Sequence, residues 1–284
     1  MNTIELGGIT ISRVVESEGP TPVGFLLPDA SEETLRPHAT WMAPHFYDPE
    51  SGKFIMSIHS FIVRTRHHTI LVDTCVGNSK KRAVPNWNMR DGPYLQDLQA
   101  AGISPEQVDF VMCTHLHVDH VGWNTRLENG RWVPTFPNAR YLFAREEWEF
   151  WKRSKQEEHE QIMKDSVLPI IEADQADLVH KDHAIEDGLR FEPTPGHTPG
   201  HVSLHLSSGG QEAVITGDMM HHPVQMAEAD WCSHFCVDKT QAVATRKAFL
   251  ARYADRDVRI LGTHFAAPVA GRIVSAGDSW RFQV

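Results

Sequence analysis

The sequence predicts an α/β or α+β layered domain, because segments with strand character occur along the whole chain with helical segments before, between and after them. Short apolar runs rich in β-branched residues are bounded by turns that contain glycine, proline and aspartate. No internal repeat, low-complexity tract or glycine/serine linker divides the 284 residues. We therefore expect a single domain over residues 1–284.

The strands are identified by their apolar runs and by the turns between them. Gly7-Gly8 separates the first two runs as in a two-residue hairpin, and Arg66-His67-His68 is the expected turn of a second hairpin. The last two runs are expected to form a closing hairpin. The expected strands are residues 4–6, 9–11, 55–65, 69–73, 108–113, 140–144, 189–192, 202–206, 213–216, 258–262, 271–274 and 280–282.

Three helices are expected between these strands. Residues 93–101 form a short helix closed by Gly102, and residues 240–253 form another. Residues 145–172 carry a partial apolar stripe and are expected to be a helical insertion. Residues 17–50 are rich in proline with scattered aromatic residues, which predicts a long ordered loop over a surface, on the side where substrate binds.

Charge and hydropathy narrow the class of partner. The formal net charge of −10 argues against a nucleic-acid groove and against an anionic membrane surface, because both need a basic footprint. The sequence contains no run of about 18 apolar residues, so no membrane-spanning helix is expected. The segment Met1–Gly8 lacks a basic region followed by an apolar one, and the four cysteines form no paired metal-site pattern. We therefore expect a cytoplasmic protein with reduced thiols.

The segment from His115 to His120 contains three imidazoles and one carboxylate within six residues, directly after the apolar run 108–113. These candidate ligands are His115, His117, Asp119 and His120. One tetrahedral metal with an open position needs only three protein ligands, so the segment predicts two metals and further ligands downstream.

Three later strands also end in residues that bind metals. His197 lies in a turn punctuated by glycine and proline, Asp218 follows Gly217 after a strand, and His264 follows the strand 258–262. Open α/β sheets place their sites at such strand ends. Five imidazoles and two carboxylates suit borderline divalent ions, with Zn first and Mn, Fe, Co or Ni as alternatives.

The order and spacing of these residues, from Asp73 to His264, resemble the metallo-β-lactamase superfamily. The resemblance implies an α+β fold, a four-layer αβ/βα sandwich in which two mixed β-sheets pack face to face with helices outside. It implies that Asp218 bridges two metals and that Asp73 orients a ligand imidazole. The implied ligands are His115, His117 and His197 for the first metal and Asp119, His120 and His264 for the second.

Two branches of the superfamily remain after comparison of motifs: methyl parathion hydrolase-like enzymes and N-acyl homoserine lactonases. The lactonases have a tyrosine three residues after the bridging aspartate, where this chain has His221, and the Gly-Asp-x-x-His pattern is closer to methyl parathion hydrolase. Flavodiiron proteins have glutamate in place of His117. Exported β-lactamases and nucleases with a basic channel fit the sequence less well. Relatives of both remaining branches are often dimeric, which favours a homodimer.

These patterns favour a dinuclear-metal hydrolase in which a bridging hydroxide cleaves a lactone or ester, with phosphotriesters as additional substrates. In this hypothesis Asp119 or Asp218 takes the proton as the intermediate collapses, and His221 donates a hydrogen bond to the developing oxyanion or to the leaving oxygen. Three alternatives remain open: a mononuclear-iron oxidoreductase similar to persulfide dioxygenases, a glyoxalase II-like thioesterase, and a metal-binding module without catalysis. The sequence shows no basic C-terminal helical segment that would bind glutathione, which disfavours the thioesterase.

Aromatic residues in loops are the candidates for an apolar substrate pocket. They are Trp41, Phe46, Trp87, Trp231 and Phe265. Among the remaining histidines, His201 and His205 are expected to pack or to make a backbone hydrogen bond rather than to bind metal. His67 and His68 are expected to be a solvated pair.

Overall fold

Two mixed β-sheets organise the computed structural model, which describes residues 3–284; Met1 and Asn2 of the N-terminal segment lie outside the described residues. The chain forms two units. Unit 1 comprises the chain up to Glu16 together with Ile58–Lys181, and unit 2 comprises Ser17–Ser57 together with Asp182–Val284. Two of the three divisions fall within long strands, and the third, between Lys181 and Asp182, falls in a loop. The fold class is α+β with mixed sheets, as the sequence predicts.

The first sheet has antiparallel strands at one edge and parallel strands at the other. β5, β6, β9 and β10 are parallel neighbours, and β4 pairs with β5 in the antiparallel sense. Because β5 and β6 are parallel and Val72 pairs with Met112, the loops that follow these two strands leave the sheet side by side. In spatial order its strands are β1 (Ile4–Leu6), β2 (Ile9–Pro22), β4 (Lys53–Arg64), β5 (Thr69–Val72), β6 (Phe110–Met112), β9 (Arg140–Ala144) and β10 (Ala176–Val179), with β3 (Tyr47–Asp48) paired to β4.

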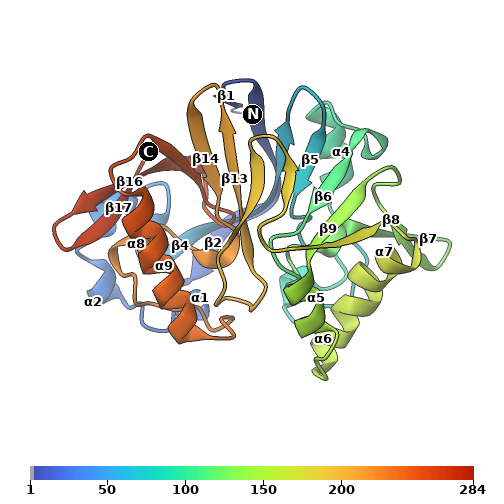
Figure 1. Cartoon of the computed structure of the whole chain (residues 1–284). Coiled ribbons are helices and arrows are strands. Elements are labelled where there is room, and N and C mark those ends of the chain that lie inside the picture. The colour runs from blue at the N-terminus through green and yellow to red at the C-terminus, as the bar shows by residue number, and fades with distance from the viewer. Residues whose placement is uncertain (1–2) are drawn as a thin grey trace. The chain divides into compact units, whose positions relative to one another are not determined.

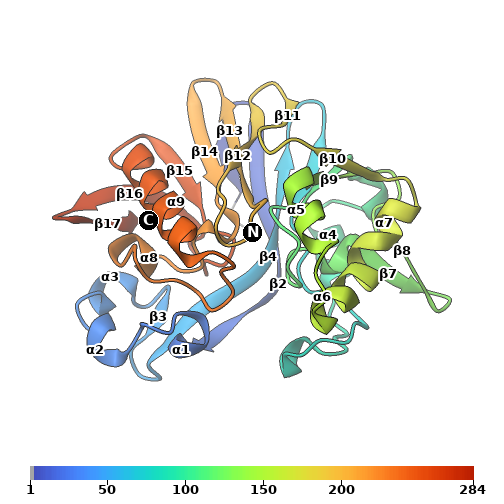
Figure 2. The same cartoon turned by 60° about the horizontal axis from the view of Figure 1, so that its bottom comes forward.

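The helices of unit 1 bury apolar side chains against this sheet. Trp148 and Trp151 pack in one core with Tyr141 and Phe143 of β9, and Figure 2 shows the helices grouped beside β9 and β10. The unit also has a separate hairpin, β7 (Thr125–Glu128) and β8 (Arg131–Pro134), which the sequence patterns did not predict. The helices are α4 (Tyr94–Ala100), α5 (Arg145–Trp151), α6 (Glu157–Ile162) and α7 (Leu168–Glu172), with short 3-10 turns at Pro85–Trp87, Pro105–Gln107 and Gly122–Asn124.

The expectation of helix across residues 145–172 holds in part. α5 and α6 are separate, and a π-helical turn, Met163–Val167, joins α6 to α7. Pro169 lies in the first turn of α7, where its missing N–H is tolerated. The carboxylate of Asp165, in the π-helical turn, accepts two hydrogen bonds of 2.8 Å from the buried guanidinium of Arg82. A tertiary ion pair therefore interrupts the regular helical pattern.

Lys80 is buried beside the same turn. Its ammonium donates to the Asp165 carbonyl and to Thr125 Oγ1, each at 2.7 Å, and lies 3.7 Å from the centre of the Trp132 ring. Burial lowers the pKa of Lys80 to about 7, against the attraction of Asp165. The buried polar groups of Lys80, Arg82 and Asp165 therefore hold the π-helical turn in place.

The second sheet lies wholly within unit 2. Its strands are antiparallel neighbours except for β14 and β15, which are parallel. Phe249 and Leu250 of α9 pack with Val214 of β14 and Ile260 of β15, and Figure 1 shows α9 beside these strands. In order the strands are β11 (Ala184–Glu186), β12 (Leu189–Pro193), β13 (Val202–Ser208), β14 (Gln211–Ile215), β15 (Val258–Leu261), β16 (Ala270–Ala276) and β17 (Ser279–Gln283). The helices after β14 are α8 (Val224–Ala227) and α9 (Lys239–Tyr253), with a 3-10 turn at Gly217–Met219.

Residues 17–50 were expected to form a loop over a surface, but part of this segment packs into a core. After the end of β2 the segment forms three short helices, α1 (Val23–Leu26), α2 (Glu32–Leu35) and α3 (Ala39–Met42). Leu27, Leu35, Met42 and Phe46 of this segment are buried in the core of unit 2. None of the helices formed by residues 3–284 is long and apolar enough to cross a membrane.

Candidate metal centre

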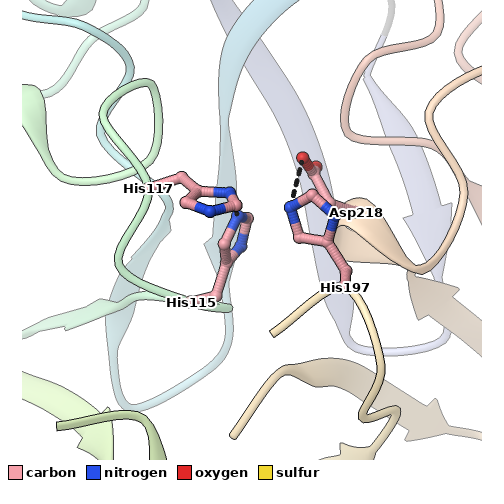
Figure 3. Close-up of side chains that lie close together, drawn as sticks. All are labelled: His115, His117, His197 and Asp218. Carbon is pink, nitrogen blue, oxygen red and sulfur yellow. Dashed lines mark hydrogen bonds and ion pairs between the residues drawn. The ribbon is translucent and has the colours of Figure 1, made fainter. Parts of the chain in front are cut away.

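The loop after β6 carries all four donor residues of unit 1. His115, His117, Asp119 and His120 follow the strand within eight residues of its last residue, Met112. Nε2 of His115 lies 2.9 Å from Nδ1 of His117, and Figure 3 shows these two imidazoles turned toward each other. Nε2 of His120 lies 3.6 Å from an oxygen of Asp119. The loop thus gathers three imidazoles and a carboxylate as the spacing predicts.

Asp73 anchors this loop from the end of β5. Its carboxylate accepts hydrogen bonds from the Thr114 amide at 2.8 Å and from the Thr114 hydroxyl at 2.9 Å. It also lies 2.9 Å from Nδ1 of His120. Because Nδ1 is held by the carboxylate, Nε2 is the nitrogen of His120 that is oriented to bind a metal. The contact between Asp73 and an imidazole is the one that the resemblance implies.

Glu147 holds the same loop from α5, and the sequence reasoning missed it. Its Oε1 accepts from the Leu116 amide at 3.1 Å and from the Trp151 indole at 2.6 Å. The Trp151 ring packs edge-on against His117, with 5.3 Å between ring centres. Both Glu147 and Trp151 are buried. The only sequence signal was an acidic residue within the apolar stripe of a helix.

In unit 2, three donor residues come from three different strand ends. His197 lies in the turn between β12 and β13, Asp218 follows β14, and His264 follows β15. One carboxylate oxygen of Asp218 lies 3.4 Å from Nε2 of His197, the pair drawn in Figure 3, and the other lies 3.1 Å from Nε2 of His264. Each oxygen of this carboxylate therefore faces a different imidazole, as a carboxylate that bridges two metals requires.

The outer nitrogens of the two imidazoles are held by neutral partners. Nδ1 of His264 lies 3.0 Å from the carbonyl oxygen of Ser57 and donates to it, which leaves Nε2 with its lone pair toward Asp218. Nδ1 of His197 lies 3.6 Å from the sulfur of Cys236. A backbone carbonyl has no signature in the sequence, and neither of these partners was predicted.

His201 positions Asp218 through the backbone. The Asp218 amide donates to Nε2 of His201 at 2.8 Å, so the imidazole is neutral, and its Nδ1–H donates to the Thr194 hydroxyl at 2.9 Å. The expectation of a backbone hydrogen bond for His201 is confirmed.

Gly196 allows the neighbouring turn to approach α9, because its φ is +133° and a Cβ there would lie 2.3 Å from the Ala242 nitrogen.

His221 and His222 are adjacent but have different surroundings. Nε2 of His221 lies 3.3 Å from the Asp218 carboxylate, and burial lowers the pKa of this imidazole although Asp218 opposes the shift. His222 instead stacks on Phe54 with 3.9 Å between ring centres, and its Nε2 lies 2.8 Å from the Phe46 carbonyl. Burial lowers the pKa of His222 to about 3. His221 therefore faces the donor groups, whereas His222 is part of the core.

The five aromatic pocket candidates divide into two groups. Phe46 and Phe265 are fully buried in the core of unit 2 and pack on Phe282 with ring centres 5.8 and 5.2 Å away. Their role in unit 2 is packing, because each ring is enclosed by others. Trp41 and Trp231 are half-buried against the same core, and Trp87 is half-buried in unit 1.

The chemistry of the donor set fits divalent metal ions. The candidate ligands are nitrogen and oxygen donors without a thiolate, which suits Zn, Mn, Fe, Co and Ni. In both units an imidazole has one nitrogen fixed by a neighbouring acceptor while the other faces a further donor group.

The family model described as the metallo-beta-lactamase superfamily matches residues 55–262. The chain is 27% identical over 168 residues to an N-acyl homoserine lactonase of a Bacillus species, a match that covers 54% of this chain and 59% of the relative. It is 31% identical over 123 residues to the N-acyl homoserine lactonase AttM of Rhizobium radiobacter, covering 40% of this chain and 42% of the relative. The matches thus span at most about three fifths of these relatives.

Two solved structures have the same fold over nearly the whole chain. The hydrolase AbOPH of the beta lactamase superfamily superposes with a TM-score of 0.81 and 26% identity, covering 99% of this chain and 96% of that one. AidC, a dizinc quorum-quenching lactonase, superposes with a TM-score of 0.81 at 23% identity and with the same coverage. This similarity concerns the fold alone. The chain belongs to the metallo-beta-lactamase superfamily, and its mixed sheets and helices form the fold of that family.

Proposed function

We propose that the protein is a dinuclear metal-dependent hydrolase of lactones and esters, with phosphotriesters as additional substrates. The observation that carries the proposal is the geometry of Asp218, whose two oxygens lie 3.4 and 3.1 Å from the imidazoles of His197 and His264. Membership of the superfamily and the similarity to N-acyl homoserine lactonases support the same reaction class.

The proposed ligand set has seven residues and holds two ions, with zinc as the first candidate. The carboxylate of Asp218 would contact both ions. His115, His117 and His197 bind the first ion, and Asp119, His120 and His264 bind the second. When bound, two such ions would supply a hydroxide nucleophile at neutral pH and would polarise the substrate oxygen.

The remaining steps belong to side chains of this chain. Asp119 or Asp218 accepts the proton released as the intermediate collapses. His221 donates a hydrogen bond to the developing oxyanion or to the leaving oxygen. Three half-buried tryptophans offer apolar surface to the substrate: Trp41, Trp87 and Trp231. The segment 17–50, which contains Trp41, is proposed to lie on the substrate side.

A substrate panel tests the reaction class. Protein loaded with zinc, manganese or cobalt is assayed on acyl lactones, aryl esters, thioesters and phosphotriesters, and hydrolysis of the lactones and esters is expected. Turnover of thioesters alone would favour the thioesterase reading. Consumption of oxygen with a thiol substrate and one iron per chain would favour the oxidoreductase.

His221→Phe tests the role of that imidazole. The variant removes the hydrogen-bond donor but keeps a planar ring of similar size, and kcat/KM for the best substrate is expected to fall by about 100-fold. His222→Phe is not a suitable control because His222 is a core residue. His67→Phe, at an exposed turn, is the control and should leave kcat/KM near the wild-type value. An unchanged kcat/KM in His221→Phe would remove the proposed role.

A further inference from the structure

The helix α5 ends in a tryptophan that lies against a proposed metal ligand. Trp151 is the last residue of the helix, and its side chain is buried. Its ring lies 5.3 Å from the ring of His117, centre to centre, and the two ring planes are nearly perpendicular, at 84°. Rings in this arrangement attract each other, because the electron-rich face of one meets the electron-poor edge of the other. The contact therefore favours one orientation of the His117 imidazole.

The three imidazoles of the loop after β6 are held in different ways. Nδ1 of His120 lies 2.9 Å from a carboxylate, and Nδ1 of His115 lies 3.1 Å from the Thr114 hydroxyl. Nδ1 of His117 instead lies 2.9 Å from Nε2 of His115, and Figure 3 shows these two rings turned toward each other as two ligands of one ion would be. The nitrogen of His117 that faces its neighbour is thus the one expected to bind metal, while Trp151 contacts the ring itself.

Trp151 is itself fixed by two further contacts. Its indole N–H donates to Oε1 of the buried Glu147 at 2.6 Å, and the same oxygen accepts from the Leu116 amide at 3.1 Å. The imidazole of His159, on α6, packs on the indole with 4.3 Å between ring centres. Nδ1 of His159 in turn lies 2.7 Å from the Ser154 hydroxyl. The indole is therefore held by a buried carboxylate and by a second ring, so it can impose a fixed orientation on its neighbour.

We propose that Trp151 is a positioning residue, whose ring sets the plane of the His117 imidazole for metal binding. This inference rests on the proposed function, in which His117 binds the first ion. An imidazole that is already held in its binding orientation gives up less rotational freedom when it binds the ion. Loss of the ring contact should therefore weaken metal binding, as loss of other side chains that orient ligand histidines does.

Cobalt binding tests the proposal without a substrate, because the visible absorption bands of bound Co(II) depend on the arrangement of its ligands. In Trp151→Leu we expect one of the two cobalt-binding steps to weaken by about 10-fold and the bands to shift. Trp151→Phe keeps an aromatic ring at this position and should recover most of the affinity and the wild-type bands. Wild-type affinity and bands in a folded Trp151→Leu variant would overturn the proposal. A Trp151→Phe variant as impaired as Trp151→Leu would also overturn it, because the ring contact would not be what orients His117.

Trp148→Leu is the matched control for the loss of packing. Trp148 lies on the same helix and is buried in the same core, but its ring contacts none of the candidate ligands in the part of the chain that the structure describes. Both leucine variants should therefore lose stability to urea, whereas Trp148→Leu should keep the wild-type cobalt bands and affinity. Equal changes of the cobalt bands in the two variants would overturn the proposal, because they would follow from the general loss of packing.

The wild-type protein separates the failure of this inference from the failure of the proposed function. A wild type that binds no cobalt would overturn both. A wild type that binds two cobalt ions but hydrolyses no lactone or ester would overturn the proposed reaction alone, because the bands of Trp151→Leu still decide the role of the ring. A wild type that binds two ions, with unchanged bands and affinity in Trp151→Leu, would overturn the positioning role alone.

Discussion

The two units assemble their donor side chains in opposite ways. In unit 1, one loop after β6 supplies all four donors, and the carboxyl groups of Asp73 and Glu147 hold it. In unit 2, three strand ends supply one donor each, and their partners are neutral: the carbonyl of Ser57, the thiol of Cys236 and the imidazole of His201. Hydrogen bonds to charged groups are stronger than neutral ones. The geometry of unit 1 therefore depends on a few strong acceptors, whereas that of unit 2 depends on how its strand ends are packed.

Removing one ligand from either unit should have the largest effect. His115→Ala and His264→Ala each delete one proposed ligand, so both should lose metal and reduce lactone hydrolysis to the background rate. Metal content by mass spectrometry and kcat/KM measure the two effects. His67→Ala, at an exposed turn, is the control. Wild-type metal content in either ligand variant would refute that ligand's assignment.

Asp73→Asn should have the next largest effect. The carboxylate receives hydrogen bonds from the Thr114 amide, the Thr114 hydroxyl and the His120 imidazole, and an amide NH2 cannot accept them all. Metal affinity should fall by about 10- to 100-fold. Asp109→Asn is the matched control, since Asp109 accepts from a strand-end amide on the exposed side of unit 1. Equal metal affinities in the two variants would show that Asp73 does not orient His120.

His201→Ala should have a smaller effect, because the hydrogen bond it removes is between neutral groups. The Asp218 amide loses its acceptor, and the carboxylate is less well oriented, so kcat/KM should fall by about 10-fold. His205→Ala is the control, since its imidazole pairs only with a surface carboxylate, Glu212, at 3.5 Å. A loss as large as that of Asp73→Asn would contradict the distinction between charged and neutral partners.

Lys80→Met should change stability and leave hydrolysis near the wild-type rate. Because the pKa of Lys80 is about 7 in the folded chain and higher in the unfolded chain, the unfolded chain binds more protons above pH 7. The wild type should therefore gain stability relative to the variant as pH rises from 7 toward 10, by at most about 1.4 kcal/mol per pH unit. Urea unfolding of both proteins at pH 6.5 and 9 measures this difference. The same difference at both pH values would contradict a buried, perturbed amine.

The sequence was sufficient to locate the candidate donors, but it did not reveal most of the residues that contact and orient them. His115 to His120, His197, Asp218 and His264 are visible because ligand-type residues directly follow apolar strands, and β6, β14 and β15 form where these strands are predicted. Asp73 follows the same rule. Glu147 does not, because it lies on a helix and reaches the loop only through tertiary packing.

Tertiary contacts also explain where the fold differs from the predictions. The helix predicted over residues 145–172 is divided into α5, α6 and α7, and Arg82, far away in sequence, binds Asp165 at the π-helical turn between the last two. The proline-rich segment 17–50 buries Met42 and Phe46, since short turns can present apolar residues to a core without helical periodicity. Phe46 and Phe265 were expected in a pocket but lie in the core, because an aromatic residue in a loop has the same local sequence in either place.

The most direct test of the account is the metal content of the wild type and of Asp218→Asn. The wild type should hold about two divalent ions per chain, and the variant about one or fewer, because an amide cannot bridge two cations as a carboxylate does. The fold of both proteins is compared by circular dichroism. Fewer than about 1.5 ions in carefully loaded wild-type protein, or two ions retained in a folded Asp218→Asn variant, would contradict a dinuclear centre joined by Asp218.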